Sequence, residues 1–209
     1  MNRFHCLFSR MFLPAAVLTL AVLLLLISLF ETTQAAYLPS DGGKTLHIIM
    51  YHSILKDPAR TGKYVVTPAQ LKADFEYLRK HGYTSVLPRD LVKYAKGEAD
   101  LPEKCVMLTF DDGYYNNLLY LLPLLEEYSL NALISVVGKF ARIYTDNGDK
   151  NPNYAHLSYD DIRLLDASGK IEIGNHTYDM HKLEPIRGSG RKKGESDAQY
   201  DKRLSGDLM

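Results

Sequence analysis

The sequence has no excess of either charge, because 25 Lys and Arg balance 25 Asp and Glu among 209 residues. That balance provides no electrostatic footprint for a nucleic acid, so we expect no nucleic-acid partner. Cysteine is scarce, and Cys6 and Cys105 are too far apart in the chain to indicate a disulfide framework. We expect Cys105 to be a small buried core residue. Tryptophan and internal repeats are both absent.

One long apolar run is present near the start of the chain. Arg3 and Arg10 precede it, and it extends from about residue 11 to residue 30. About 20 apolar residues are enough to span a bilayer, whereas signal-peptide cores usually have about 7–15. We therefore expect residues 1–30 to be a cytoplasmic n-region and a single-pass membrane anchor, with a signal peptide cleaved near residues 33–35 and a secreted product as the alternative. Either arrangement exports the rest of the chain, because the basic residues stay in the cytoplasm.

The remainder of the sequence predicts a short linker and one α/β domain. Residues 31–44 are small and polar, as in a linker, and residues 45–209 form the domain. Strand and helix patterns alternate there, which favours parallel strands joined by helical crossovers. The patterns predict strands at 46–51, 83–87, 104–110, 130–137 and 171–174, helices at 68–81, 89–96, 116–128, 159–165 and 196–209, and a loop at 140–154.

Two adjacent acids follow the most apolar of these strands. The run Val106–Phe110 stops at Asp111 and Asp112, and Gly113 comes next. Active sites of α/β proteins lie at the carboxyl ends of parallel strands. Neighbouring residues of a strand point to opposite faces, so the two acids share one environment only if the strand has already ended, which a turn at Gly113 allows. We expect one acid to bind a metal and the other to transfer a proton.

A second strand pattern provides the nitrogen ligands. Residues 170–174 end in glycine, and His176 and His181 follow five positions apart. Two imidazoles and one carboxylate, with a coordination position left open, fit a catalytic Zn²⁺ or a related divalent ion. Asp179 lies between the histidines and is an alternative ligand in place of His181.

These two motifs together resemble the polysaccharide deacetylase family, also described as NodB-homology or carbohydrate esterase family 4 enzymes. The resemblance rests on Thr-Phe-Asp-Asp-Gly-Tyr at 109–114 and on Gly-Asn-His-Thr at 174–177 with His181. It extends from about Leu46 to the end of the chain. The wider histidine spacing, and Met-Tyr-His-Ser-Ile at 50–54, are similar to the subset that deacetylates poly-N-acetylglucosamine of biofilms.

The resemblance implies a function and a set of site residues. The function is metal-dependent hydrolysis of the acetamide groups of an extracellular N-acetylated polysaccharide, either peptidoglycan or poly-N-acetylglucosamine. The metal is a divalent ion, with Zn²⁺ as the default for this ligand set. Six positions then have expected roles: Asp111 as catalytic base, Asp112, His176 and His181 as metal ligands, and Tyr114 and His52 as substrate-binding candidates.

The resemblance is incomplete at its C-terminal side. A complete barrel takes about 250 residues, and the family's later motifs, which include a tryptophan and a Leu-x-x-His segment, do not follow His181 in this sequence. We therefore expect an incomplete, distorted (β/α) barrel of the NodB-homology type, preceded by a transmembrane helix. We expect weak metal binding. Deacetylation should be poor unless His52 or His156 replaces the missing proton donor. The alternatives are an inactive membrane-tethered glycan-binding module, or a glycosidase that uses Asp111 and Asp112.

Overall fold

A computed structural model describes residues 44–182 and 188–208 of the chain. The expected membrane anchor at residues 1–30 and nearly all of the expected linker lie outside this range, so both stay predictions. In the described part of the chain, none of the helices combines the length and the apolar character needed to cross a lipid bilayer.

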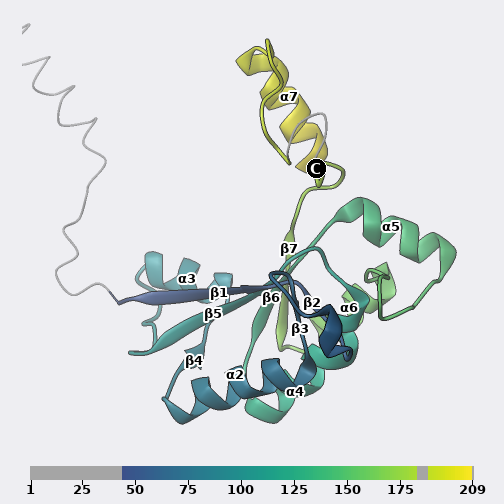
Figure 1. Cartoon of the computed structure of the whole chain (residues 1–209). Coiled ribbons are helices and arrows are strands. Elements are labelled where there is room, and N and C mark those ends of the chain that lie inside the picture. Colours follow the sequence, from purple (N-terminus) through teal and green to yellow (C-terminus); the bar gives the residue numbers. More distant parts are fainter. Residues whose placement is uncertain (1–43, 183–187, 209) are drawn as a thin grey trace, which may run out of the picture. The chain divides into compact units, whose positions relative to one another are not determined.

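Strands and helices alternate along the described chain, as the sequence predicts (Figure 1). In chain order the elements are β1 (Leu46–Tyr51), β2 (Ser53–Ile54), η1 (Pro58–Arg60), β3 (Val65–Val66), α2 (Pro68–Lys80), β4 (Thr84–Ser85), α3 (Pro88–Ala95), β5 (Cys105–Phe110), η2 (Asn117–Leu121), α4 (Leu122–Tyr128), β6 (Ala132–Val136), α5 (Gly138–Asn147), α6 (Tyr159–Ala167), β7 (Ile171–Asn175) and α7 (Asp197–Leu208).

The main sheet has five strands, all of them parallel, which confirms the predicted α/β class. β1 pairs along the whole of β5, from Leu46 opposite Cys105 to Tyr51 opposite Phe110. β4 and β6 pair with the start and the end of β5, and β7 pairs with β6. β2 and β3 form a separate two-stranded sheet. The parallel arrangement brings the carboxyl ends of β5 and β7 to the same edge.

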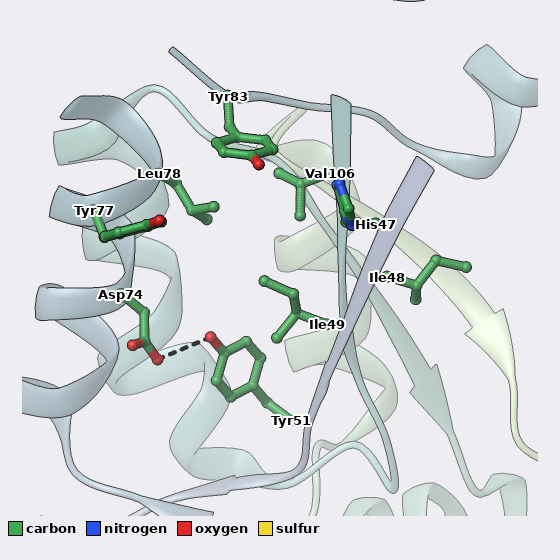
Figure 2. Close-up of a pocket in the computed structure, with 9 residues that line it drawn as sticks. All are labelled: His47, Ile48, Ile49, Tyr51, Asp74, Tyr77, Leu78, Tyr83 and Val106. Atoms are coloured by element: carbon green, nitrogen blue, oxygen red, sulfur yellow. Dashed lines mark hydrogen bonds between the residues drawn. The ribbon is translucent and has the colours of Figure 1, made fainter. Parts of the chain in front are cut away.

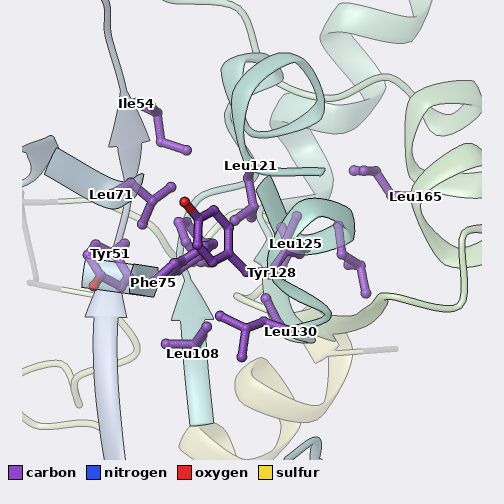
Figure 3. Close-up of a cluster of buried hydrophobic side chains, with 14 of the residues drawn as sticks. Tyr51, Ile54, Leu71, Phe75, Leu108, Leu121, Leu125, Tyr128, Leu130 and Leu165 are labelled. Carbon is purple, nitrogen blue, oxygen red and sulfur yellow. The ribbon is translucent and has the colours of Figure 1, made fainter. Parts of the chain in front are cut away.

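The hydrophobic core lies between one face of the sheet and helices α2, α4 and α6 (Figure 3). It contains fully buried side chains from each layer, such as Phe75 of α2, Phe110 of β5 and Leu125 of α4. Tyr51 stacks on Phe110 with ring centroids 5.0 Å apart. Each such side chain contributes about 1.5–3 kcal/mol on burial, so the core fixes these helices against the sheet. On the other face, α3 packs over Cys105, which is fully buried as expected.

The predicted helix starts at α2 and α6 are confirmed by their capping interactions. The hydroxyl of Thr67 accepts the N–H of Gln70 at 3.1 Å, and Pro68 occupies the first helical position. At α6, Ser158 accepts the N–H of Asp161, whose carboxylate accepts the N–H of Ser158 at 3.0 Å. Both are capping boxes, in which side chains satisfy the first unpaired N–H groups of a helix.

The structure corrects the sequence prediction at one helix. Residues 138–147 form α5 where a loop was expected; Ala141 is the buried residue of this helix, and Gly148 ends it with φ 69°. The expected helix at 116–128 is present, and it is adjusted as a proline inside a helix predicts: a π-helical segment, η2, leads into α4. Pro123 lacks the N–H of a regular helix, and the wider turns of η2 precede it.

β1 lies at an edge of the sheet, since no strand in residues 44–182 and 188–208 pairs with its other side. Ile48 and Met50 are 61% and 58% exposed there. A cavity of about 530 Å³ opens between β1 and α2 (Figure 2). Inside it the hydroxyl of Tyr51 donates to Asp74 at 2.9 Å, and burial raises the pKa of Tyr51 above its ordinary value.

The turn after β5 requires a glycine for two separate reasons. Gly113 has φ 68°, a left-handed backbone that side chains disfavour. A Cβ at this position would also lie 2.9 Å from Cγ1 of Val136 on β6. Gly97 has a similar φ of 71°, but no atom lies within 4 Å of the position its Cβ would take.

We expect Gly113→Ala to destabilise the fold more than Gly97→Ala. Both variants bear the cost of a left-handed alanine, about 1–2 kcal/mol, but only Gly113→Ala forces Val136 to move. Chemical denaturation of the two variants and the unsubstituted chain measures the difference. Equal losses of unfolding free energy would show that the approach to Val136 is not a packing constraint.

Candidate metal site

The strand β5 ends before the two acids, so they are not held on its two opposite faces. β5 stops at Phe110, and the N–H of Asp111 donates to the carbonyl of Tyr51 at 2.9 Å. Asp112 then has φ 70°, which is rare for a residue other than glycine. Its side chain is buried, with the residue 6% exposed, whereas Asp111 is half-buried. The two carboxylates therefore occupy different environments, as separate roles require.

The histidines follow β7 on a loop that continues the sheet pairing. The N–H of His176 donates to the carbonyl of Val136 at 2.9 Å, which places it beside the end of β6. Thr177 has φ 68°, and its N–H donates to the side chain of Asn175 at 2.6 Å. This turn redirects the chain toward His181.

The acid turn and the histidine loop converge on one point. One ligand atom each from Asp112, His176 and His181 lies within 4.8 Å of the other two. Oδ1 of Asp112 is 3.0 Å from Nε2 of His181 and 3.5 Å from Nε2 of His176. The same Oδ1 is buried and has no hydrogen-bond partner. A buried carboxylate oxygen that faces two imidazole nitrogens, and is satisfied by neither, fits a divalent metal site.

All six residues expected at the site line one pocket of about 450 Å³. His52 packs on Tyr64 in its wall, with ring centroids 4.8 Å apart. The complete lining consists of Met50, His52, Tyr64, Asp111, Asp112, Tyr114, His176, His181, Lys182 and Gly188. The structure thus brings the predicted residues together, while their individual roles stay predictions.

Asp179, the alternative ligand, does not join this group. Its carboxylate forms salt bridges with Lys182 at 2.9 Å and with Lys139 at 3.1 Å. Hydrogen bonds from Lys182 and then from Lys139 lower the pKa of Asp179. The two ammonium groups satisfy this carboxylate, so the structure favours His181 over Asp179 as the third ligand.

Comparison with known proteins identifies the family. Residues 98–205, just over half of the chain, match the polysaccharide deacetylase family. The chain belongs to the polysaccharide deacetylase family. It is 29% identical over 157 residues to the polysaccharide deacetylase-type protein YxkH of Bacillus subtilis (strain 168), covering 75% of this chain and 50% of that protein.

Two further proteins are similar to this family member. It is 24% identical over 181 residues to a poly-beta-1,6-N-acetyl-D-glucosamine N-deacetylase of Escherichia coli O157:H7, covering 79% of this chain and 27% of that protein. The solved structure of a de-N-acetylase from Aggregatibacter actinomycetemcomitans has a TM-score of 0.65 and 25% identity, covering 78% of this chain and 70% of that one. The chain spans half the length, or less, of these curated relatives.

Sequence reasoning missed one residue that organises this deacetylase-family site. Asn116 is fully buried and links three segments. Its Oδ1 accepts the N–H of Ile54 at 3.0 Å, and its Nδ2 donates to Ser53 at 2.9 Å and to the carbonyl of Pro152 at 3.0 Å. It therefore fixes the loop that carries His52 against the segment that carries the acids. Its position three residues after Gly113 gave no indication of these distant partners.

The sequence also did not reveal a cluster of aromatic side chains around His156, which lies behind Tyr114 of the pocket wall. His156 stacks on Tyr114 at 4.7 Å and packs against Phe140 at 4.5 Å and Tyr144 at 5.4 Å between ring centroids. Its Nδ1 is buried without a hydrogen-bond partner. Burial lowers the pKa of His156 to about 4 and raises the pKa of Tyr114, to which the negative charge of Asp112 adds. His156 is therefore neutral at physiological pH.

The site geometry predicts which side chains control metal affinity. Asp112→Asn and His181→Gln should each weaken Zn²⁺ binding about a hundredfold or more, since even residues that only support a ligand change affinity by about 10–100-fold. Asp179→Asn is the matched control and should stay within about threefold of the unsubstituted chain. Competition with a fluorescent zinc chelator measures all three. A larger loss for Asp179→Asn than for His181→Gln would reverse the ligand assignment.

The neutral His156 predicts a loss of stability in acid. A histidine in the unfolded chain has a pKa of about 6.5, so between about pH 6.5 and pH 4 the unfolded state binds a proton that the folded state does not. Stability falls as the pH falls through this window. In metal-free protein, His156→Phe should lose roughly 2 kcal/mol less than the unsubstituted chain between pH 7 and pH 4.5.

Denaturant titrations at the two pH values provide the measurement for His156→Phe. His81→Phe, at an exposed position after α2, controls for the removal of one histidine. An unchanged pH dependence in His156→Phe would show that the aromatic cluster does not hold a neutral imidazole.

Proposed function

We propose that this chain carries a metal-dependent polysaccharide N-deacetylase site, which hydrolyses acetamide groups of an extracellular N-acetylglucosamine polymer. The observation that carries this proposal is the convergence of Asp112, His176 and His181 beside Asp111 in one pocket. Family membership supports the reaction class. Relatives named poly-beta-1,6-N-acetyl-D-glucosamine N-deacetylases support that polymer over peptidoglycan as the substrate.

In this proposal Asp112, His176 and His181 hold a divalent cation, with Zn²⁺ as the default. Three protein ligands of this kind leave a coordination position open, as catalytic zinc sites require. A zinc ion held in this way polarises a carbonyl group and lowers the pKa of a bound water to about 7.

Asp111 accepts the proton of the attacking water, because it lines the pocket beside the ligands and the hydrogen bond of its N–H to Tyr51 fixes its backbone. The water oxygen joins the acetyl carbon, the carbon–nitrogen bond breaks, and acetate and a free amino group remain. His52 and Tyr64 present aromatic surface to the sugar. Tyr114 covers the inner wall of the pocket.

The leaving amine needs a proton, and the sequence offered His52 or His156 for this step. His52 lines the pocket, whereas His156 lies behind Tyr114 in the aromatic cluster. We therefore assign the step to His52. His52 then donates the proton that the leaving amine takes up as the carbon–nitrogen bond breaks.

A glycan-binding module without activity is the second candidate. The aromatic wall of the pocket, with Tyr64 and His52, favours it, since such rings pack against sugar faces in any binding site. In that case the polymer would bind and no acetate would appear. Release of acetate therefore distinguishes the deacetylase from the glycan-binding module.

We also propose the setting of this site. The sequence supports a single-pass membrane anchor at residues 1–30 and a linker at residues 31–44, with secretion after signal cleavage as the alternative. The parallel order of the sheet and its covering helices support an incomplete, distorted (β/α) barrel of the NodB-homology type.

The deciding experiment measures acetate released from a poly-β-1,6-N-acetylglucosamine oligomer with Zn²⁺ present. We expect release that chelation abolishes and that Asp111→Asn reduces by about a hundredfold or more, since general bases contribute about 10²–10⁴-fold. Asp111→Asn should retain zinc affinity within about threefold, because Asp111 is not a ligand. Asp166→Asn, at an exposed position of α6, is the control and should retain full activity.

Two results would change the assignment. Retention of the oligomer by zinc-loaded chain without any acetate would establish the glycan-binding module instead. Acetate release that survives chelation would remove the metal from the reaction.

A further inference from the structure

The loop between the two candidate histidine ligands is gripped by a residue far along the chain. Asp207 lies near the end of α7, and both of its carboxylate oxygens accept backbone N–H groups of this loop. Oδ2 accepts the N–H of Tyr178 at 2.7 Å, and Oδ1 accepts the N–H of Asp179 at 2.9 Å. These two residues lie midway between His176 and His181. One carboxylate therefore fixes two consecutive peptide groups of the loop that presents both imidazoles.

The opposite side of the same loop is held by the start of α5. The N–H of Gly138 donates to the carbonyl of Thr177 at 3.1 Å, and the N–H of Lys139 donates to the carbonyl of Tyr178 at 2.9 Å. The carbonyls of the loop thus point toward α5 and its N–H groups toward Asp207. Because both sides of the loop are hydrogen-bonded, the left-handed turn at Thr177 is held in one conformation. The loss of Asp207 would free one of the two sides.

The helix itself has no use for a carboxylate at this position. Asp207 lies in the last turn of α7, where the partial negative charge of the helix dipole disfavours an acid. The side chain is half-buried against the loop instead of extending into solvent. Asp207 is unfavourable for its own helix, but it accepts two backbone N–H groups of the histidine loop. We therefore look for its role in that loop.

Within the C-terminal segment, Arg203 ties α7 to the residues just before the helix, and two further contacts join this segment to the histidine loop and the end of β7. Arg203 of α7 donates to both carboxylate oxygens of Glu195, at 2.7 and 2.8 Å, and to the carbonyl of Gly190 at 2.9 Å. The hydrogen bonds from Arg203 lower the pKa of Glu195 to about 2. Nη1 of Arg203 lies 3.7 Å from the sulfur of Met180, which is buried beside His181. At the other end, the side chain of Asn175 donates to the carbonyl of Leu208 at 3.4 Å.

We propose that Asp207 is a positioning residue of the metal site, which sets the separation of His176 and His181 by holding the peptide groups between them. This inference rests on the proposed metal site. α7 contributes no metal ligand, but in this inference it controls the metal affinity of Asp112, His176 and His181. The geometry predicts that the loop loses its fixed shape, and the site its affinity, when this one carboxylate is removed.

The test compares Asp207→Ala with Asp201→Ala, the same change at an exposed position of the same helix. Zn²⁺ affinity from chelator competition should fall about 10–100-fold in Asp207→Ala, the usual effect of residues that orient metal ligands. It should stay within about twofold in Asp201→Ala. Asp207→Asn keeps one acceptor oxygen and the size of the side chain, so its affinity should fall between those of the unsubstituted chain and Asp207→Ala.

A second readout does not depend on the metal. Amide hydrogen exchange at Tyr178 and Asp179 in the metal-free chain should accelerate about tenfold or more in Asp207→Ala, since a hydrogen bond to a charged group contributes about 1.5 kcal/mol or more, while exchange in β5 stays unchanged. Accelerated exchange within β5 would indicate that Asp207→Ala destabilises the whole fold. In that case Asp207→Asn is compared with the unsubstituted chain instead.

The outcomes separate this inference from the proposed function. Zinc binding that is equally tight in the unsubstituted chain, Asp207→Ala and Asp207→Asn would overturn the positioning role alone. Absence of zinc binding by the unsubstituted chain would overturn the metal site, and the positioning role with it. Tight binding that falls only in the Asp207 variants, together with faster exchange in the loop, would establish the role.

Discussion

A left-handed backbone at one aspartate is the constraint on which the site depends. β5 delivers its last side chain at Phe110, and with φ 70° at Asp112 and 68° at Gly113 the chain turns at once. The buried carboxylate of Asp112 then faces the imidazoles, while Asp111 stays on the pocket wall. Such a conformation in a residue other than glycine costs about 1–3 kcal/mol and persists only where its surroundings determine it. Here the buried strand before it and the close packing after it do so.

Val136 at the end of β6 connects the two halves of the site. Its side chain meets the turn at Gly113 so closely that a Cβ there would overlap it. Its carbonyl accepts the N–H of His176. One residue of the strand between β5 and β7 thus sets the spacing of the acid turn and the histidine loop. A parallel sheet makes this possible, because its strands end side by side at one edge.

The sequence predicted the ends of β1 and β5, the caps of α2 and α6, and six residues of the pocket, because each of these is marked by residues within a few positions. A run of apolar residues that stops at acids, or Ser158 three residues before Asp161, is a local pattern. α5 was missed because the Asp, Asn, Gly and Pro residues that follow it indicate a loop, and its only buried side chain is Ala141. Asn116 and Asp207 were missed for another reason, since their partners lie 62 and 29 positions away. Contacts over such separations leave no signal in one sequence unless recognisable motifs mark both partners, as they do for Asp112 and the two histidines.

The edge of the sheet at β1 has a practical meaning for work with this polypeptide. Within residues 44–182 and 188–208, no strand pairs with one side of β1, so that side presents free amide and carbonyl groups. Ile48 and Met50 add exposed apolar side chains to this strand. The exposed edge of a sheet can pair side by side with a strand of another chain. β1 therefore makes association of concentrated samples a risk during purification, and a fused soluble carrier would lower that risk.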